Sequence, residues 1–179
     1  MNIIGIDQLI YGANDLAASV QFMQDFGLTE VPNQAFGRAF ETLDGTGILA
    51  AEADHAALPA KLPSMSQLRK MVYGVADQAT LDAIQAELST DRDVKMLDNG
   101  ALETVDDSGI CIGFQISIRR ELNLPVEKIN APGAAHERPL NVLGVDHSIE
   151  IKPRTLAHTA VFVPDAAKAE AFYVKRLGF

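Results

Sequence analysis

The side chains best suited to chemistry in this sequence are four histidines, one cysteine and twenty-four carboxylates. Imidazole, thiolate and carboxylate groups bind metal ions and transfer protons. His55 lies in an expected loop, and His136 and His147 lie in a proline-containing stretch, so we expect none of the three to take part in catalysis. His158 lies within an expected strand and is the candidate metal ligand. Cys111, on an expected buried strand, is predicted to be inert packing.

The carboxylates form two sequence pairs of interest. Asp7 and Glu52 could together hold a metal ion weakly. Asp106 and Asp107 precede Ser-Gly, so we expect them to stabilise a turn and not to act as a general acid and base. The acidic residues therefore predict no strong site by themselves.

The elements that would position these side chains are copies of one unit. The first and last parts of the chain align without a gap at an offset of 151 residues, which pairs Asp7 with His158. Each copy contains an apolar strand, a capping residue (Asn14 or Asp165), a helix of about three turns and a glycine (Gly27 or Gly178).

A weaker copy begins at Lys70 and has Asp77 as its cap. Sets of three strand-like segments follow the first two helices, at roughly 28–34, 37–43 and 46–52, and at roughly 93–97, 100–106 and 110–117. The sequence therefore predicts an α+β fold of paired βαβββ modules.

The order of these elements predicts three regions. Residues 1–117 form an N-terminal domain of two modules, at about 1–55 and 68–117. Residues 118–154, which contain four of the eight prolines, form a linker. Residues 155–179 supply the first strand and helix of a truncated third module.

Composition excludes several classes of function. The net charge is −9, and the basic residues are scattered, which argues against nucleic-acid binding. No apolar run approaches the ~20 residues that a membrane span needs. A single cysteine and the lack of a secretory signal favour a cytoplasmic protein.

The pattern of strand, cap, helix and aromatic-x-x-x-Leu-Gly-Phe at 156–179 resembles the vicinal-oxygen-chelate superfamily. This group includes glyoxalases, bleomycin-resistance proteins and type I extradiol dioxygenases. The resemblance implies a mixed, curled sheet with helices on the outside. The closest likeness is to the start of the catalytic domain in two-domain extradiol dioxygenases, where His158 matches the first histidine ligand of Fe(II).

That resemblance also implies the chemistry of the parent protein. Two histidines and a glutamate would hold Fe(II), with Mn, Zn or Ni as alternatives, and a catechol-type substrate and O₂ would take the open positions. The first two modules would pair without a metal. Asp7 and Lys70 stand at the histidine position there, and Ala51 and Gly113 at the carboxylate position.

The second histidine and the glutamate would then lie beyond Phe179, so we expect this chain to be an inactive fragment without bound metal. We also expect it to form a homo-oligomer, because an unfinished module leaves apolar surface uncovered. Two alternatives stay open for the parent: a glyoxalase-like lyase or isomerase, and a non-enzymatic protein that binds a small molecule.

Overall fold

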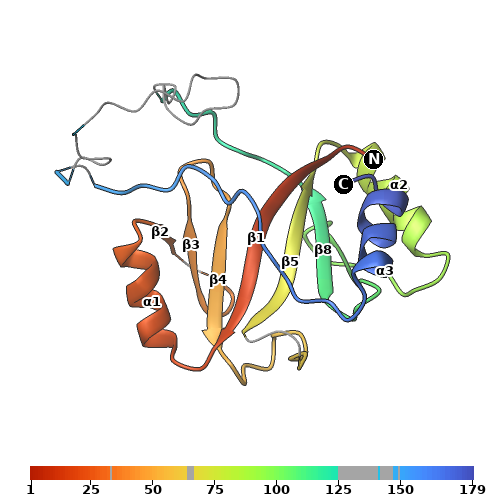
Figure 1. The fold of residues 1–179 in the computed structure, drawn as a ribbon, viewed down its shortest axis with the longest axis horizontal. Coiled ribbons are helices and arrows are strands. Elements are labelled where there is room, and N and C mark those ends of the chain that lie inside the picture. The colour runs from red at the N-terminus through yellow and green to blue at the C-terminus, as the bar shows by residue number, and fades with distance from the viewer. Residues whose placement is uncertain (33, 64–66, 125–140, 142–146, 149) are drawn as a thin grey trace.

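The computed structural model describes residues 1–32, 34–63, 67–124, 141, 147–148 and 150–179, and its centre is one eight-stranded mixed sheet (Figure 1). The strands are β1 (Ile3–Ala13), β2 (Thr29–Val31), β3 (Arg38–Glu41), β4 (Gly47–Glu52), β5 (Leu68–Val75), β6 (Lys95–Met96), β7 (Leu102–Val105) and β8 (Cys111–Ile116). The helices are α1 (Leu16–Asp25), α2 (Gln78–Leu88) and α3 (Ala166–Glu170), which a π-helix, η1 (Ala171–Arg176), continues. The predicted α+β fold is confirmed.

Two βαβββ units build the sheet, in the strand order β2-β3-β4-β1-β5-β8-β7-β6. Within each unit the first strand pairs in parallel with the last, β1 with β4 and β5 with β8. The units meet where β1 and β5 pair antiparallel, with Gln8 opposite Val72 and Ile10 opposite Lys70. This central pairing turns two small sheets into one.

The helix caps follow the prediction in two units of three. Asp77 and Asp165 accept hydrogen bonds from Thr80 N and Lys168 N, as expected of residues that satisfy the free N–H groups of a first turn. In the first unit the expected cap, Asn14, is wrong by one residue. Asp15 caps α1 by accepting from Ala18 N at 2.9 Å.

The distance along the chain from the helix cap to the glycine is one residue greater in the last copy than in the first. Asp15 and Gly27 are twelve positions apart, whereas Asp165 and Gly178 are thirteen apart. The wider π-helical turn of η1 takes up this additional residue. The two glycines therefore align at an offset of 151 residues, whereas the two caps align at an offset of 150. Counted from the caps, His158 aligns in sequence with Gln8 instead of Asp7.

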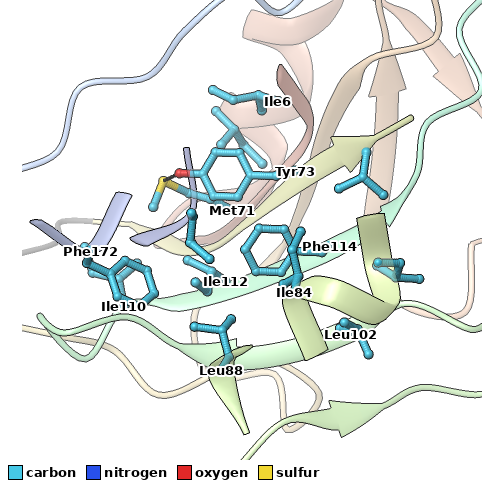
Figure 2. Close-up of a cluster of buried hydrophobic side chains, with 14 of the residues drawn as sticks. Ile6, Met71, Tyr73, Ile84, Leu88, Leu102, Ile110, Ile112, Phe114 and Phe172 are labelled. Atoms are coloured by element: carbon cyan, nitrogen blue, oxygen red, sulfur yellow. Dashed lines mark hydrogen bonds between the residues drawn. The ribbon is translucent and has the colours of Figure 1, made fainter. Parts of the chain in front are cut away.

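The main hydrophobic core lies between the sheet and its helices (Figure 2). Sheet residues such as Phe114 and Ile112 pack there against Ile84 and Leu88 of α2, and all four side chains are fully buried. A smaller cluster under α1 contains Met23, Leu28 and Phe40. We call this side of the sheet the helical face.

The predicted opening strand of the third unit does not form: no strand is assigned between residues 150 and 165 in the described part of this segment. β1 and β5, over which the segment passes, already have a strand on each side, so neither offers a free edge. The segment lies across the helical face instead, with Leu156, Val161 and Val163 packed against the main core (Figure 1). Burial of apolar side chains, not strand pairing, therefore holds it.

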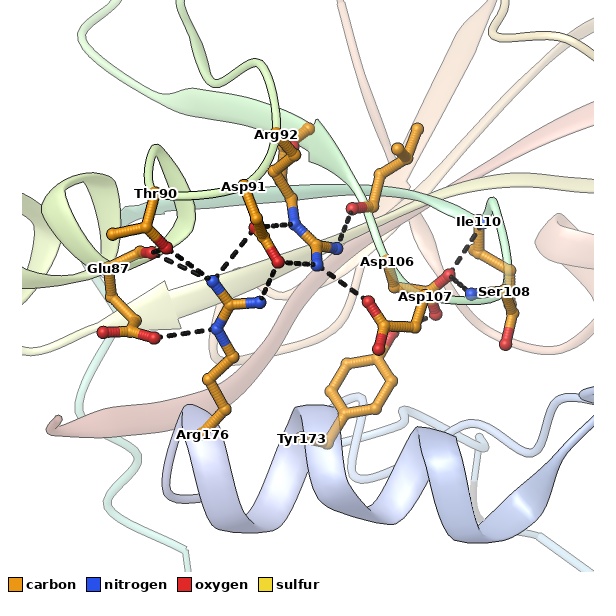
Figure 3. A network of polar contacts seen from close by, with 12 residues as sticks. Glu87, Thr90, Asp91, Arg92, Asp106, Asp107, Ser108, Ile110, Tyr173 and Arg176 are labelled. Carbon is orange, nitrogen blue, oxygen red and sulfur yellow. Dashed lines mark hydrogen bonds and ion pairs between the residues drawn. The ribbon is translucent and has the colours of Figure 1, made fainter.

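Residues 150–179 are referred to as the C-terminal segment, and equivalent turns of the two units anchor it. Leu43 N and Asp44 N donate to the carbonyls of Pro153 and Arg154 at 3.0 Å, at the turn between β3 and β4. In the other unit, Tyr173 donates to Asp106 Oδ2 at 2.7 Å, at the turn between β7 and β8 (Figure 3).

Cationic side chains tie the end of the segment to α2 and to the residues that follow this helix. Arg176 donates to Glu87 and Asp91, each at 2.8 Å (Figure 3). The Arg92 guanidinium lies 4.8 Å from the centre of the buried Phe172 ring, a cation–π geometry. Charge and burial act together at this contact.

Leu177→Ala tests the contribution of this docking. Leu177 has no exposed surface, so its truncation should lower the free energy of unfolding by about 2–5 kcal/mol. The matched control is Val174→Ala, at a half-exposed position in η1, which should change it by less than about 0.5 kcal/mol. Chemical denaturation of both variants provides the measurement, and equal effects would contradict the docking.

All three tyrosines of the chain should ionise late. Burial raises the pKa of Tyr73 to about 12 and raises the pKa values of Tyr11 and Tyr173 as well. Phenolate absorbance of the native protein should therefore be small at pH 10, where the denaturant-unfolded chain is half ionised. Because the unfolded state loses these protons first, stability should be complete below pH 10 and fall as pH rises towards 12. Tyr73→Phe should reduce that fall.

Candidate functional site

The face of the sheet opposite the helices holds a cavity of about 260 Å³. Residues of five strands and three loops line it: Gln8, Ile10, Phe36, Leu49, Ala57, Pro59, Lys70, Val72, Leu97, Asn99, Ala101, Leu102, Glu103, Gly113 and Gln115. We call it the Lys70 cavity. One side of it is apolar, and the other carries amides and one ion pair.

Strand register identifies the equivalent positions of the two units in this cavity. Gln8 pairs with Gly47, the first residue of β4, and Lys70 pairs with Cys111, the first residue of β8. Gln8, not Asp7, is thus the counterpart of Lys70. His158 precedes its helix cap, Asp165, by seven residues, just as Gln8 precedes Asp15 and Lys70 precedes Asp77. The three residues therefore share a position in the sequence repeat, although His158 lies on no strand.

The position predicted for a carboxylate ligand also needs correction in the first unit. The β3–β4 turn has its left-handed glycine at Gly45, with φ of 91°, and the β7–β8 turn has its own at Gly109, with φ of 81°. Four residues further on stand Leu49 and Gly113, so Ala51 was the wrong position. Both Leu49 and Gly113 line the Lys70 cavity, and neither side chain binds metal.

Lys70 is the charged group of the cavity. Its side chain is 8% exposed and forms an ion pair with Glu103, whose side chain is 30% exposed. A side chain at position 113 would start 2.9 Å from Lys70 Cε, so the glycine there leaves room for the lysine chain. The lysine side chain therefore fills the space beside position 113.

Asp7 belongs to a neighbouring polar cluster. It accepts hydrogen bonds from Ser117 Oγ at 2.8 Å, from Gln115 Nε2 at 3.2 Å and from Arg119 at 3.2 Å. Glu52 is not near it: Glu52 pairs with Ala13, six residues further along β1, which is about 20 Å away. The structure does not bring together the weak metal pair considered from the sequence.

His158 lies on the other side of the sheet. Its side chain is exposed and lines a pocket of about 330 Å³ beside Tyr73, Tyr173 and Phe179, and none of the described residues that line this pocket is an Asp or a Glu. In the described ranges, no three His, Cys, Asp or Glu residues come close enough together to hold a metal ion. The described residues around His158 therefore do not form a metal centre.

The contacts and exposure of the other histidines and of Cys111 are as follows. His55 Nδ1 accepts from Ala57 N at 3.2 Å, and its ring stacks on Phe36. Burial raises the pKa of Cys111 to about 11, so its thiol stays protonated at neutral pH. His147 is exposed, and His136 lies outside the described residues.

Sequence reasoning did not single out Gln8, Glu103 or Arg119. Glu103 stands opposite Gly113 on the neighbouring strand, a pairing that only the strand register reveals. An isolated polar residue within a strand carries no comparable signal in the sequence.

Of the comparisons with known proteins, the one with solved structures finds matches. No protein-family model and no curated protein sequence matches the chain. A Mn(II)-bound glyoxalase from Novosphingobium aromaticivorans aligns over 99% of this chain and 54% of its own, with a TM-score of 0.64 and 16% identity. A catechol 2,3-dioxygenase aligns over 99% and 58%, with a TM-score of 0.63 and 15% identity.

A halotolerant catechol dioxygenase aligns over 99% of this chain and 56% of its own, with a TM-score of 0.67 and 11% identity. The chain thus spans little more than half the length of these three proteins. Among the described residues, no helix is long and apolar enough to cross a membrane. The paired βαβββ units and these matches together show that the chain has the fold of the vicinal-oxygen-chelate superfamily.

Proposed function

We propose that this chain contributes the first half of a Fe(II)-dependent extradiol dioxygenase that cleaves a catechol-type aromatic substrate. The observation that carries the proposal is the shared sequence position of Gln8, Lys70 and His158, each seven residues before a helix cap. The first two line the cavity of the paired units, so a third unit would place His158 in the corresponding cavity of a second pair.

The chemistry of the first pair supports this division of roles. An amide, an ammonium group, Leu49 and Gly113 occupy the positions where the fold would hold a metal. The first pair is then the metal-free half, and His158 is one ligand of a metal centre whose other ligands come from further modules. The dioxygenases among the structural matches support the substrate class.

A glyoxalase-like, metal-dependent lyase or isomerase is the second candidate. The match to a Mn(II)-bound glyoxalase favours it, at a TM-score close to those of the dioxygenases. The two reactions differ in their need for oxygen, because ring cleavage consumes O₂ and an isomerisation or lyase reaction does not.

The test uses the product of the whole reading frame that contains this chain, loaded with Fe(II). Catechol should drive O₂ uptake, and His158→Ala should reduce both the iron content and the rate of uptake at least about 100-fold. His147→Ala, which changes an exposed histidine outside the repeated unit, is the matched control and should keep both.

Substrate turnover without O₂ uptake would move the assignment to the glyoxalase-like reaction. Full activity and iron content in the His158→Ala protein would remove His158 from the metal centre and reject the repeat argument with it.

A further inference from the structure

We propose that the Lys70 cavity is a metal-independent binding site for a small phenol, that is, one aromatic ring carrying a hydroxyl group. The site lies on the face of the sheet opposite His158 and uses none of the groups assigned to the metal centre. It therefore stands or falls separately from the proposed dioxygenase activity.

The polar end of the cavity matches a hydroxyl group. An ammonium has three N–H donors, and among the described residues the hydrogen bond of Lys70 Nζ goes to Glu103 Oε2. The remaining donors of this buried group need an acceptor. A hydroxyl oxygen can accept from Lys70, and its proton can be donated to Glu103, so a single group satisfies both members of the pair.

The opposite end of the cavity matches a ring. Ile10, Leu49 and Val72 form a buried apolar cluster there, and Phe36 packs against it. A protein cavity of about 150 Å³ with an aliphatic and aromatic lining is enough to bind benzene. The Lys70 cavity, at about 260 Å³, accommodates one substituted ring.

The charge balance selects against a carboxylate ligand. Glu103 already neutralises Lys70, and Asp7 lies in the adjoining polar cluster. A carboxylate would enter a region with no surplus positive charge and meet Glu103 directly, which raises its desolvation cost without an offsetting ion pair. A neutral hydroxyl group carries no such cost.

The wall of the cavity is formed in advance. Ala57 and Pro59 line it from the loop that follows β4, and Arg69 holds that loop by donating to Ala53 O at 2.8 Å and to Pro59 O at 3.2 Å. Glu103 is the partly exposed member of the ion pair, so entry is from its side.

The experiment titrates the chain with phenol, toluene and benzoate in the presence of a chelator, and follows methyl NMR signals of Ile10, Leu49 and Val72. Phenol should produce saturable shifts, whereas toluene and benzoate should bind at least about tenfold more weakly. Lys70→Met should weaken phenol binding about tenfold, and Lys95→Met, at an exposed edge position, should leave it unchanged.

Glu103→Gln provides a second test that a merely unfolded variant could not pass. It keeps the shape of the side chain and leaves the Lys70 charge unbalanced, so benzoate should now bind more tightly than phenol. The proposal is overturned if wild-type protein prefers benzoate or toluene, if phenol shifts do not saturate, or if Glu103→Gln fails to reverse the preference in a folded protein.

Discussion

The antiparallel pairing of β1 with β5 is the interaction on which the rest of the structure depends. Each unit alone would have a small sheet with its first strand at the edge, and the pairing removes both edges by joining them. It also brings Gln8 and Lys70 to one cavity, although they belong to different units. The cavity is therefore a product of the pairing, and neither unit contains it alone.

The sequence predicted those features that local physical rules determine. Asp77 and Asp165 were identifiable as caps because a helix start needs a side-chain acceptor. Asn14 and Asp15 both satisfy that rule, so sequence alone did not decide between them. The one-residue widening of η1 was not predictable either, because a π-helical turn has no simple sequence signal. These two unpredicted features shifted the alignment of His158 by one position.

Features that depend on long-range pairing were harder to predict. Residues 155–163 have the apolar character of a strand, yet the described part of the chain offers no partner strand on the helical face, and the segment packs through its side chains. The ion pair of Lys70 with Glu103 joins positions 33 residues apart and follows from the register of three strands. The fold was therefore accessible from sequence patterns, whereas the composition of the cavity required coordinates.

The C-terminal segment has a thermodynamic consequence for the duplicated architecture. Two similar units joined side by side could in principle melt one after the other. Residues 153–179, however, contact the β3–β4 turn of one unit and the β7–β8 turn and α2 of the other. Loosening either unit releases this segment and withdraws its contacts from the other, so we expect the two halves to unfold in one cooperative transition.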